Sequence, residues 1–345
     1  MKPDDREQAD DPGLPCEQAS LQAIDHPCVW RGMELSTRPD WDQQISPPEQ
    51  LEFDPLARGS SIDQAPCLKQ RGKSIRESLE MGSGGVHLRG LDISSHSPES
   101  LSTAFLKLTE VIGHPISQSA AGEKIFSVRN AGYAENDPRA RGPNTRKKLS
   151  FHTDRCDVIG FLCVRQARSG GENQVVSSAA LFNEMLHKHT ELLHVLMRPF
   201  YYQRHNVDTA NRLPCTRQPV FSIYQGHFAA NFLRVLIERA HANNDLPNLS
   251  DVQREALDCL EAIAAQPEMH YTFRQQPGDI LFLNNWVTFH RRTEFEDFED
   301  PPLRRHILRA WLSMPNSRPI DPLFAGNYGD TRAGAMRGGM RAITS

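Results

Sequence analysis

Short apolar stretches recur along the middle and the C-terminal part of the chain. Residues 86–91 alternate apolar and polar side chains, as a half-buried β-strand does. Further short apolar stretches predict strands at residues 125–128, 158–164, 175–176, 280–283 and 307–312. The turns Ser169-Gly170-Gly171 and Pro277-Gly278-Asp279 lie beside some of these stretches. The pattern therefore predicts a protein with many short strands.

Apolar residues three or four positions apart predict helices between some of these strands. Residues 97–112 show this spacing, and Ser97-Pro98-Glu99 is a favourable helix start. We expect further helices at 181–196, at 229–242 and from the capping box at Ser250 to about residue 265. Strands separated by turns, with helices inserted rather than alternating, predict an α+β protein built on an antiparallel β core.

The two ends of the chain lack this regular pattern. Residues 1–70 are irregular and rich in Pro, Asp and Gln, with Trp30, Trp41 and Phe53 as scattered anchors to the main body. We expect a disordered tail over residues 1–25, followed by one domain over residues 26–345. The Gly- and Met-rich residues 332–341 are expected to be flexible because of their composition.

The overall composition is that of a globular protein and excludes several classes. Hydrophobic residues make up 38% and charged residues 24%, and the net charge of −4 argues against a nucleic-acid partner. No apolar run reaches the roughly 18 residues of a membrane span, and no secretory signal is recognisable, so a cytoplasmic location is expected. The seven cysteines are odd in number and form no CxxC pair, which predicts reduced thiols. The oligomeric state stays open.

Candidate chemistry begins with Phe151-His152-Thr153-Asp154. On a strand, His152 and Asp154 would point to the same face and present an imidazole beside a carboxylate. These are two of the three ligands of the two-histidine, one-carboxylate triad that binds iron(II) and leaves positions open. His290, after the apolar stretch 280–283, is the best candidate for the third. Taken alone, a His-x-Asp triplet is more often a surface turn or a hydrogen-bonded pair than a metal site.

Two arginines near the C-terminus strengthen the metal hypothesis. Arg305 and Arg309 are four residues apart and would lie on one face of a strand. An inward guanidinium is costly unless it meets an anion, and its planar fork suits a carboxylate. The pattern matches a co-substrate that chelates the metal through one end and carries a carboxylate at the other, and 2-oxoglutarate has that shape. The alternative is a solvated surface cluster, which the apolar neighbours at 307–312 disfavour.

Taken together, these segments resemble the taurine dioxygenase (TauD/TfdA-like) family of iron(II)- and 2-oxoglutarate-dependent oxygenases. The resemblance runs from about Trp30 to Arg341. It is strongest over residues 149–178 and 277–312. The first of these regions contains the matching segments 151–154, 169–173 and 177–178. In and next to the second region, the matching segments are 276–280, 284–285, His290 and 305–312.

The resemblance implies a double-stranded β-helix (jelly-roll) core and a specific set of site residues. His152 and Asp154 would be the proximal iron ligands, and His290 the distal one. Arg305 would pair with the far carboxylate of 2-oxoglutarate, and Arg309 would contact the co-substrate or the primary substrate. Asn173 stands where relatives often place a threonine that hydrogen-bonds 2-oxoglutarate, and an amide can replace that hydroxyl.

The resemblance also implies the reaction. 2-Oxoglutarate would take two metal positions and O2 the last, giving succinate and CO2 together with an oxidised small-molecule substrate. Related halogenases replace the carboxylate ligand with a small residue, whereas this chain has Asp154. Hydroxylation is therefore the default outcome, although desaturation and ring formation use the same type of site.

Two other functions are compatible with the residues alone. One is a cupin-like metalloenzyme that does not use 2-oxoglutarate, which dependence of turnover on 2-oxoglutarate and oxygen would separate from the first. The other is a non-catalytic small-molecule sensor that retained the fold, and the intact triad with Arg305 counts against it. The sequence does not identify the primary substrate, because substrate contacts in such a fold come largely from loops.

Overall fold

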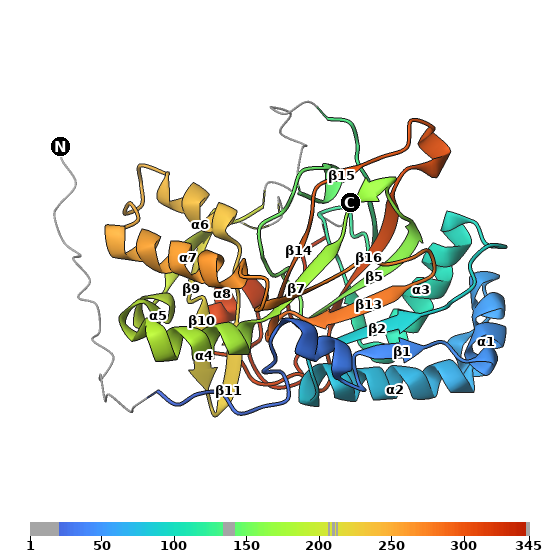
Figure 1. Cartoon of the computed structure of the whole chain (residues 1–345), viewed down its shortest axis with the longest axis horizontal. Helices are drawn as coiled ribbons and strands as arrows, with labels where there is room; N and C mark the ends of the chain where they lie inside the picture. The colour runs from blue at the N-terminus through green and yellow to red at the C-terminus, as the bar shows by residue number, and fades with distance from the viewer. Residues whose placement is uncertain (1–20, 134–141, 206–207, 209–210, 212, 343–345) are drawn as a thin grey trace.

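Two β-sheets occupy the centre of the molecule, and helices lie on either side of them (Figure 1). The computed structural model describes residues 21–133, 142–205, 208, 211 and 213–342. The strands are β1 Asp42–Gln44, β2 Gly85–Arg89, β3 His114–Ile116, β4 Ile125–Val128, β5 Val158–Arg165, β6 Ser169–Gly170, β7 Asn173–Ser177, β8 Phe200–Gln203, β9 Cys215–Gln218, β10 Phe221–Tyr224, β11 His227–Ala230, β12 His270–Phe273, β13 Ile280–Asn284, β14 Thr288–Arg292, β15 Phe295–Glu296 and β16 His306–Ser313. The helices are α1 Pro47–Ala57, α2 Pro66–Met81, α3 Pro98–Ile112, α4 Ser178–Lys188, α5 Thr190–Leu196, α6 Arg234–His241, α7 Asp251–Ala264 and α8 Ala325–Tyr328.

The two sheets face each other as in a jelly roll. The larger has seven strands in the order β1-β2-β13-β5-β16-β3, with β4 also paired to β16, and the smaller has the order β12-β7-β14. Apart from the parallel pair β1–β2, the pairs within them are antiparallel. Val175 of β7 shares a buried cluster with Ile159 and Leu281 of the larger sheet, so this cluster lies between the sheets. The predicted α+β class with an antiparallel β core is confirmed.

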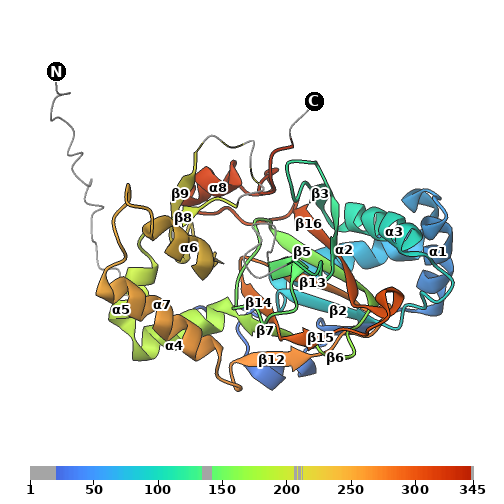
Figure 2. The same cartoon turned by 90° about the horizontal axis from the view of Figure 1, so that it is seen from above.

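Alternation along β13 divides the larger sheet into an inner and an outer face. Leu281 and Leu283 point into the cluster between the sheets, whereas Ile280 and Phe282 pack on the opposite side. That outer face is covered by α1, α2 and α3, which lie together at one end of the molecule (Figure 2). Phe105 of α3 illustrates the contact, because its ring centroid is 6.2 Å from that of Phe282.

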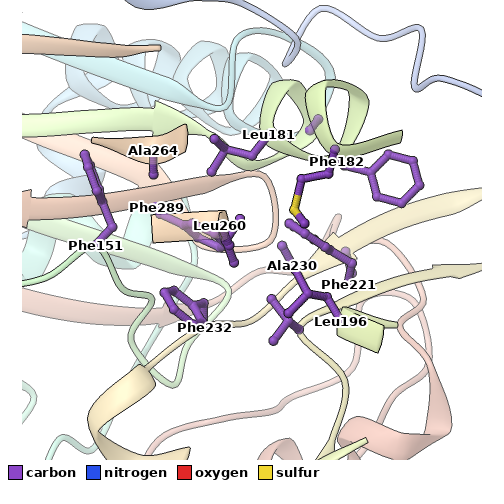
Figure 3. Packing of buried hydrophobic residues seen from close by; sticks show 14 of the residues in the cluster. Phe151, Leu181, Phe182, Leu196, Phe221, Ala230, Phe232, Leu260, Ala264 and Phe289 are labelled. Atoms are coloured by element: carbon purple, nitrogen blue, oxygen red, sulfur yellow. The ribbon is translucent and has the colours of Figure 1, made fainter. Parts of the chain in front are cut away.

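A second apolar cluster lies beneath α4–α7, at the other end of the molecule. Phe289 of β14 packs there with Leu181 of α4 and Leu260 of α7, beside Phe151 and Phe232 (Figure 3). Since neighbouring residues of a strand point to opposite faces, the burial of Phe289 in this cluster directs His290 to the other side. The packing of these helices therefore fixes the orientation of a candidate metal ligand.

Most of the elements expected from hydrophobic patterning are present. The predicted strands correspond to β2, β4, β5, β7, β13 and β16. Ser97 caps α3 by accepting a hydrogen bond from the N–H of Ser100, and Ser250 with Gln253 forms the expected capping box of α7. The turn before β13 has Gly278 at a φ of 91°, a conformation that favours glycine. Trp30, Trp41 and Phe53 are buried, as expected of anchors.

Three predictions of where helices lie are wrong. Residues 1–70 are not uniformly irregular, because α1 and the start of α2 lie there. The expected helix 181–196 is two helices, broken at His189, whose φ of −144° is not helical. The expected helix 229–242 begins only at Arg234, because Ala229 and Ala230 belong to β11. In the last case buried apolar residues continue from β11 towards α6, so their spacing alone does not reveal the change. At His189 the break falls in an exposed polar stretch, residues 187–191.

The expected N-terminal tail is only partly described by the structure. Residues 1–20 lie outside the described part of the chain, whereas Leu21 and Ile24 pack against the cluster beneath α4–α7. The six cysteines that the structure describes are free thiols. None of the helices in the described ranges combines the length and the apolar character needed to cross a bilayer.

Buried residues anchor the C-terminal segment, whose residues 332–341 were expected to be flexible, although residues 332–334 are exposed. Arg337 is 2% exposed, and its Nε donates to Asp157 Oδ1 at 2.6 Å. The same carboxylate accepts the Trp286 indole N–H at 2.7 Å and the Met314 backbone N–H at 2.8 Å. This buried network attaches the C-terminal segment to the start of β5, close to the candidate ligand Asp154.

We predict that Asp157→Ala destabilises the protein strongly. The change leaves the Arg337 guanidinium buried without a counter-ion, and breaking a buried pair in this way costs about 3–5 kcal/mol. Urea unfolding measures this as a lower midpoint. The matched control is Asp330→Ala, which removes an ion pair to Arg332, whose side chain is 84% exposed. If both variants unfold at the same urea concentration, the buried network does not have the role assigned to it.

Candidate metal centre

Backbone pairing brings the three predicted metal ligands together. His152 and His290 form an isolated antiparallel bridge in which each N–H donates to the carbonyl of the other at 3.0 Å. The expectation that residues 152–154 form a strand is wrong, because this single bridge is their only strand-like pairing among the described residues, and Asp154 follows in a loop. The side chain of Asn285 holds that loop by accepting the Asp154 N–H at 3.1 Å.

The side chains of this triad converge on a small space. One ligand atom from each of His152, Asp154 and His290 can be chosen so that all lie within 4.8 Å of one another. Asp154 Oδ2 is 3.4 Å from His290 Nε2 and 3.9 Å from His152 Nε2. Ligand atoms that each lie about 2.0–2.2 Å from one metal ion are separated by roughly these distances. Among the described residues, Asp154 Oδ2 has no hydrogen-bond donor although it is buried, as expected of an oxygen that serves as a metal ligand.

The protonation states also suit a metal. Burial and the neighbouring His290 lower the pKa of His152 to about 4, so its imidazole is neutral at ordinary pH. Its Nδ1 lies 2.9 Å from the Ser150 carbonyl and donates to it, which leaves the Nε2 lone pair free. Burial opposes the charge of Asp154, but Arg309 and the two imidazoles outweigh it and hold the pKa of that carboxyl well below its usual range.

Arg309 is held against the triad by several contacts. Its Nη1 is 3.3 Å from Asp154 Oδ1, and its Nε donates to Gln118 Oε1 at 2.7 Å. The guanidinium also lies over the rings of Trp311 and Phe126, at 4.9 and 5.1 Å from their centroids. The sequence suggested a contact to the co-substrate or the substrate, and it did not reveal this link to Asp154 or the role of Gln118.

A cavity of about 780 Å³ contains all six residues that the sequence singled out: His152, Asp154, Asn173, His290, Arg305 and Arg309. Arg305 is 4% exposed, and burial lowers its pKa to about 10. Its Nε donates to Gln166 Oε1 at 3.3 Å, whereas Nη1 is buried and has no hydrogen-bond partner among the described residues. Asn173 Nδ2 donates to Gln275 Oε1 at 3.1 Å. The cavity therefore has a triad able to bind a metal and a separate buried cation.

Arg292 is a cavity residue that sequence analysis did not select. It is 5% exposed, and burial followed by the nearby charge of Arg305 lowers its pKa to about 9. Its position two residues after His290 on β14 could have identified it, because residues two apart on a strand share a face. The turn at Gly170 packs on the same region. Its φ is 69°, and a Cβ there would overlap the carbonyl of Glu294.

Comparison with known proteins places these residues in a family context. Residues 52–311 match the model of the family described as "Taurine catabolism dioxygenase TauD, TfdA family". FR-33289 synthase of Streptomyces rubellomurinus is 30% identical over 258 residues, covering 73% of this chain and 76% of that protein. A uridine-5'-phosphate dioxygenase of Amycolatopsis sp is 28% identical over 236 residues, covering 64% of this chain and 82% of that protein.

Solved structures confirm the jelly-roll fold. Asparagine oxygenase in complex with Fe(II), 3-hydroxyasparagine and succinate has a TM-score of 0.61 at 17% identity, covering 79% of this chain and 93% of that one. The non-heme iron oxygenase OrfP in complex with Fe and alpha-ketoglutaric acid has a TM-score of 0.56 at 15% identity, covering 79% and 94%.

We predict that the triad binds a divalent metal ion and that binding stabilises the fold. Adding iron(II) anaerobically to chelator-treated protein, at about 100 times its dissociation constant, should add about 2.7 kcal/mol of stability. The thermal unfolding midpoint reports this as an upward shift. Asp154→Ala and His290→Ala should abolish the shift, whereas His227→Ala, at an exposed histidine outside the cavity, should keep it. A full shift in the first two variants would show that the metal binds elsewhere.

Proposed function

This chain belongs to the taurine catabolism dioxygenase TauD, TfdA family, and we propose that His152, Asp154 and His290 bind its iron(II). The protein is an iron(II)- and 2-oxoglutarate-dependent dioxygenase that oxidises a small molecule. One observation carries the assignment of the ligands: two imidazole nitrogens and a buried, unpartnered carboxylate oxygen converge at one wall of the cavity. Family membership favours this reaction over a sensor and over a metalloenzyme that does not use 2-oxoglutarate.

The chain's own residues prepare the site for this chemistry. When bound, iron(II) and 2-oxoglutarate activate O2 so that a substrate C–H bond is hydroxylated, with release of succinate and CO2. Asp154 supplies a fixed negative charge to the metal, and Arg309 restrains that carboxylate through its contact to Oδ1. The apolar side chains of Phe161, Ile307 and Trp311 line the same cavity and limit the access of water.

We also propose that Arg305 binds the far carboxylate of 2-oxoglutarate. A buried guanidinium with an unpartnered Nη1 is costly, and a bidentate contact to a carboxylate removes that cost. Asn173 lies in the same cavity and uses one Nδ2–H for Gln275. Its second Nδ2–H can donate to 2-oxoglutarate, in place of the threonine hydroxyl of relatives.

The charge of the cavity supports an anionic primary substrate. Seven cationic side chains line it against three carboxylates, Asp154, Glu238 and Glu261; the cations are Lys148, Arg234, Arg239, Arg291, Arg292, Arg305 and Arg309. Iron(II) and the two carboxylates of 2-oxoglutarate balance each other, so their binding leaves this positive excess in place. The name of the uridine-5'-phosphate dioxygenase relative also specifies an anionic substrate. We therefore propose that the substrate carries a phosphate or carboxylate group.

The co-substrate assignment predicts a specific absorption change. Anaerobic addition of iron(II) and 2-oxoglutarate to the wild-type protein should produce a metal-to-ligand charge-transfer band in the visible range. His152→Ala should eliminate the band, because the metal loses a ligand. Arg305→Gln should raise the 2-oxoglutarate concentration at which the band forms by about 10- to 100-fold. This is the range expected for the loss of a charge-assisted hydrogen bond. A well-folded wild-type protein without any band would contradict the proposed site.

The substrate assignment predicts a preference within matched pairs of compounds. Each pair consists of a phosphate- or carboxylate-bearing molecule and its neutral analogue, for example uridine-5'-phosphate and uridine. The anionic member of a productive pair should stimulate succinate formation with a KM at least about tenfold lower than that of the neutral member. This difference is the contribution expected of one charge-assisted contact. Productive pairs in which the neutral member is preferred would refute an anionic substrate.

A further inference from the structure

Two buried arginines in the cavity share one aromatic ring. The guanidinium carbons of Arg292 and Arg305 lie 4.7 and 5.2 Å from the centroid of the Phe295 ring. Arg292 ends β14, two residues after His290, and Arg305 immediately precedes β16. Both side chains line the same cavity as the triad. One positive charge at the end of β14 and another just before β16 are therefore held close together beside the candidate metal centre.

No described carboxylate forms an ion pair with these two arginines, although the charge of the nearby Asp297 acts to raise the pKa of both. No Asp or Glu side chain of the described residues lies within 4.0 Å of either guanidinium. Arg292 donates to the backbone carbonyls of Lys147 and Thr293, and Arg305 donates to the neutral Gln166 side chain. The nearby Asp297 uses Oδ1 to accept the backbone N–H of Arg305. Adjacent buried cations are costly without an anion, so the arrangement favours a ligand that supplies one.

Strand register places a third polar group beside the pair. Arg292 is paired directly with Asn173 across β14 and β7. Both side chains line the cavity, so the polar amide of Asn173 lies on the same side of the sheet as the Arg292 guanidinium. A guanidinium offers the planar fork and the fixed charge that a carboxylate accepts best.

We propose that Arg292 and Arg305 together bind the far carboxylate of 2-oxoglutarate, with Arg292 as a second determinant of co-substrate specificity. This inference rests on the proposed co-substrate site and extends it to a residue on the strand of a metal ligand. Each guanidinium can donate to one carboxylate oxygen, while the keto-acid end of the molecule reaches the metal. The two positive charges also favour a dicarboxylate over a keto acid with a neutral tail.

The test compares two keto acids that differ only at the far end. 2-Oxovalerate chelates a metal as 2-oxoglutarate does but carries a methyl group in place of the far carboxylate. Wild-type protein, Arg292→Gln, Arg292→Lys and the control Arg168→Gln are loaded with iron(II) anaerobically. Each is then titrated with both keto acids while the charge-transfer band is followed. Arg168 is a suitable control because its side chain is 57% exposed and pairs with Glu296.

We expect Arg292→Gln to weaken 2-oxoglutarate binding about 10- to 100-fold, as for the loss of a charge-assisted hydrogen bond. Binding of 2-oxovalerate should change by no more than about twofold, because that molecule lacks the group that Arg292 contacts. Arg292→Lys keeps the charge but not the fork, so its loss should be smaller. It provides the same comparison if Arg292→Gln fails to fold. Arg168→Gln should bind both keto acids as the wild type does.

Three results would overturn the inference. An equal loss for both keto acids would make Arg292 a structural residue that holds Lys147 and Thr293. Unchanged 2-oxoglutarate binding, with or without weaker binding of a primary substrate, would remove it from the co-substrate site. If the wild-type protein forms the band and either of these two results is found, only the role of Arg292 is contradicted. The third result is a wild-type protein that forms no band, and it contradicts the proposed function as well.

Discussion

A buried carboxylate surrounded by nitrogen atoms is the interaction on which the site depends. Asp154 is removed from water, which opposes its charge, yet Arg309 and the imidazoles of His152 and His290 keep it ionised. One of its oxygens contacts Arg309, while the other faces the imidazole nitrogens without a hydrogen bond from any described residue. A divalent cation fits this position because it satisfies that oxygen and both nitrogen lone pairs at once. The backbone bridge between the two histidines sets the spacing on which this fit relies.

The fold produces this geometry through the alternation of its strands. On β14, Phe289 enters the apolar cluster beneath α4–α7, so His290 and then Arg292 are directed into the cavity. On β16, Ile307, Arg309 and Trp311 line the cavity, whereas Leu308 and Ala310 pack beneath α1–α3. The same strands therefore stabilise the protein with one face and place charged groups with the other. Helix packing and site chemistry are coupled for this reason.

Sequence patterning predicted the strands well, because strands depend on short-range periodicity, whereas the candidate site residues were selected from the His-x-Asp triplet, the two arginines and the family resemblance. The triad, Asn173, Arg305 and Arg309 were all selected from the sequence, and the structure brings them to one cavity, although their roles as ligands stay proposals. Features set by long-range contacts were missed. Arg337 is buried because of Asp157, which is 180 residues away, so composition wrongly indicated a flexible end. Arg309 meets Gln118 at a separation of 191 residues. Local sequence context also gave one wrong prediction, a strand at residues 152–154. These residues pair with β14 through one isolated bridge instead.

The most direct test of the central claim is a crystal structure of the anaerobic complex with iron(II) and 2-oxoglutarate. We predict one metal ion bound by Nε2 of His152, Nε2 of His290 and a carboxylate oxygen of Asp154, with 2-oxoglutarate chelating the ion through its keto-acid end. Its far carboxylate should lie between the guanidinium groups of Arg305 and Arg292. A metal ion bound at any other set of residues, or a far carboxylate that meets neither arginine, would contradict this account of the site.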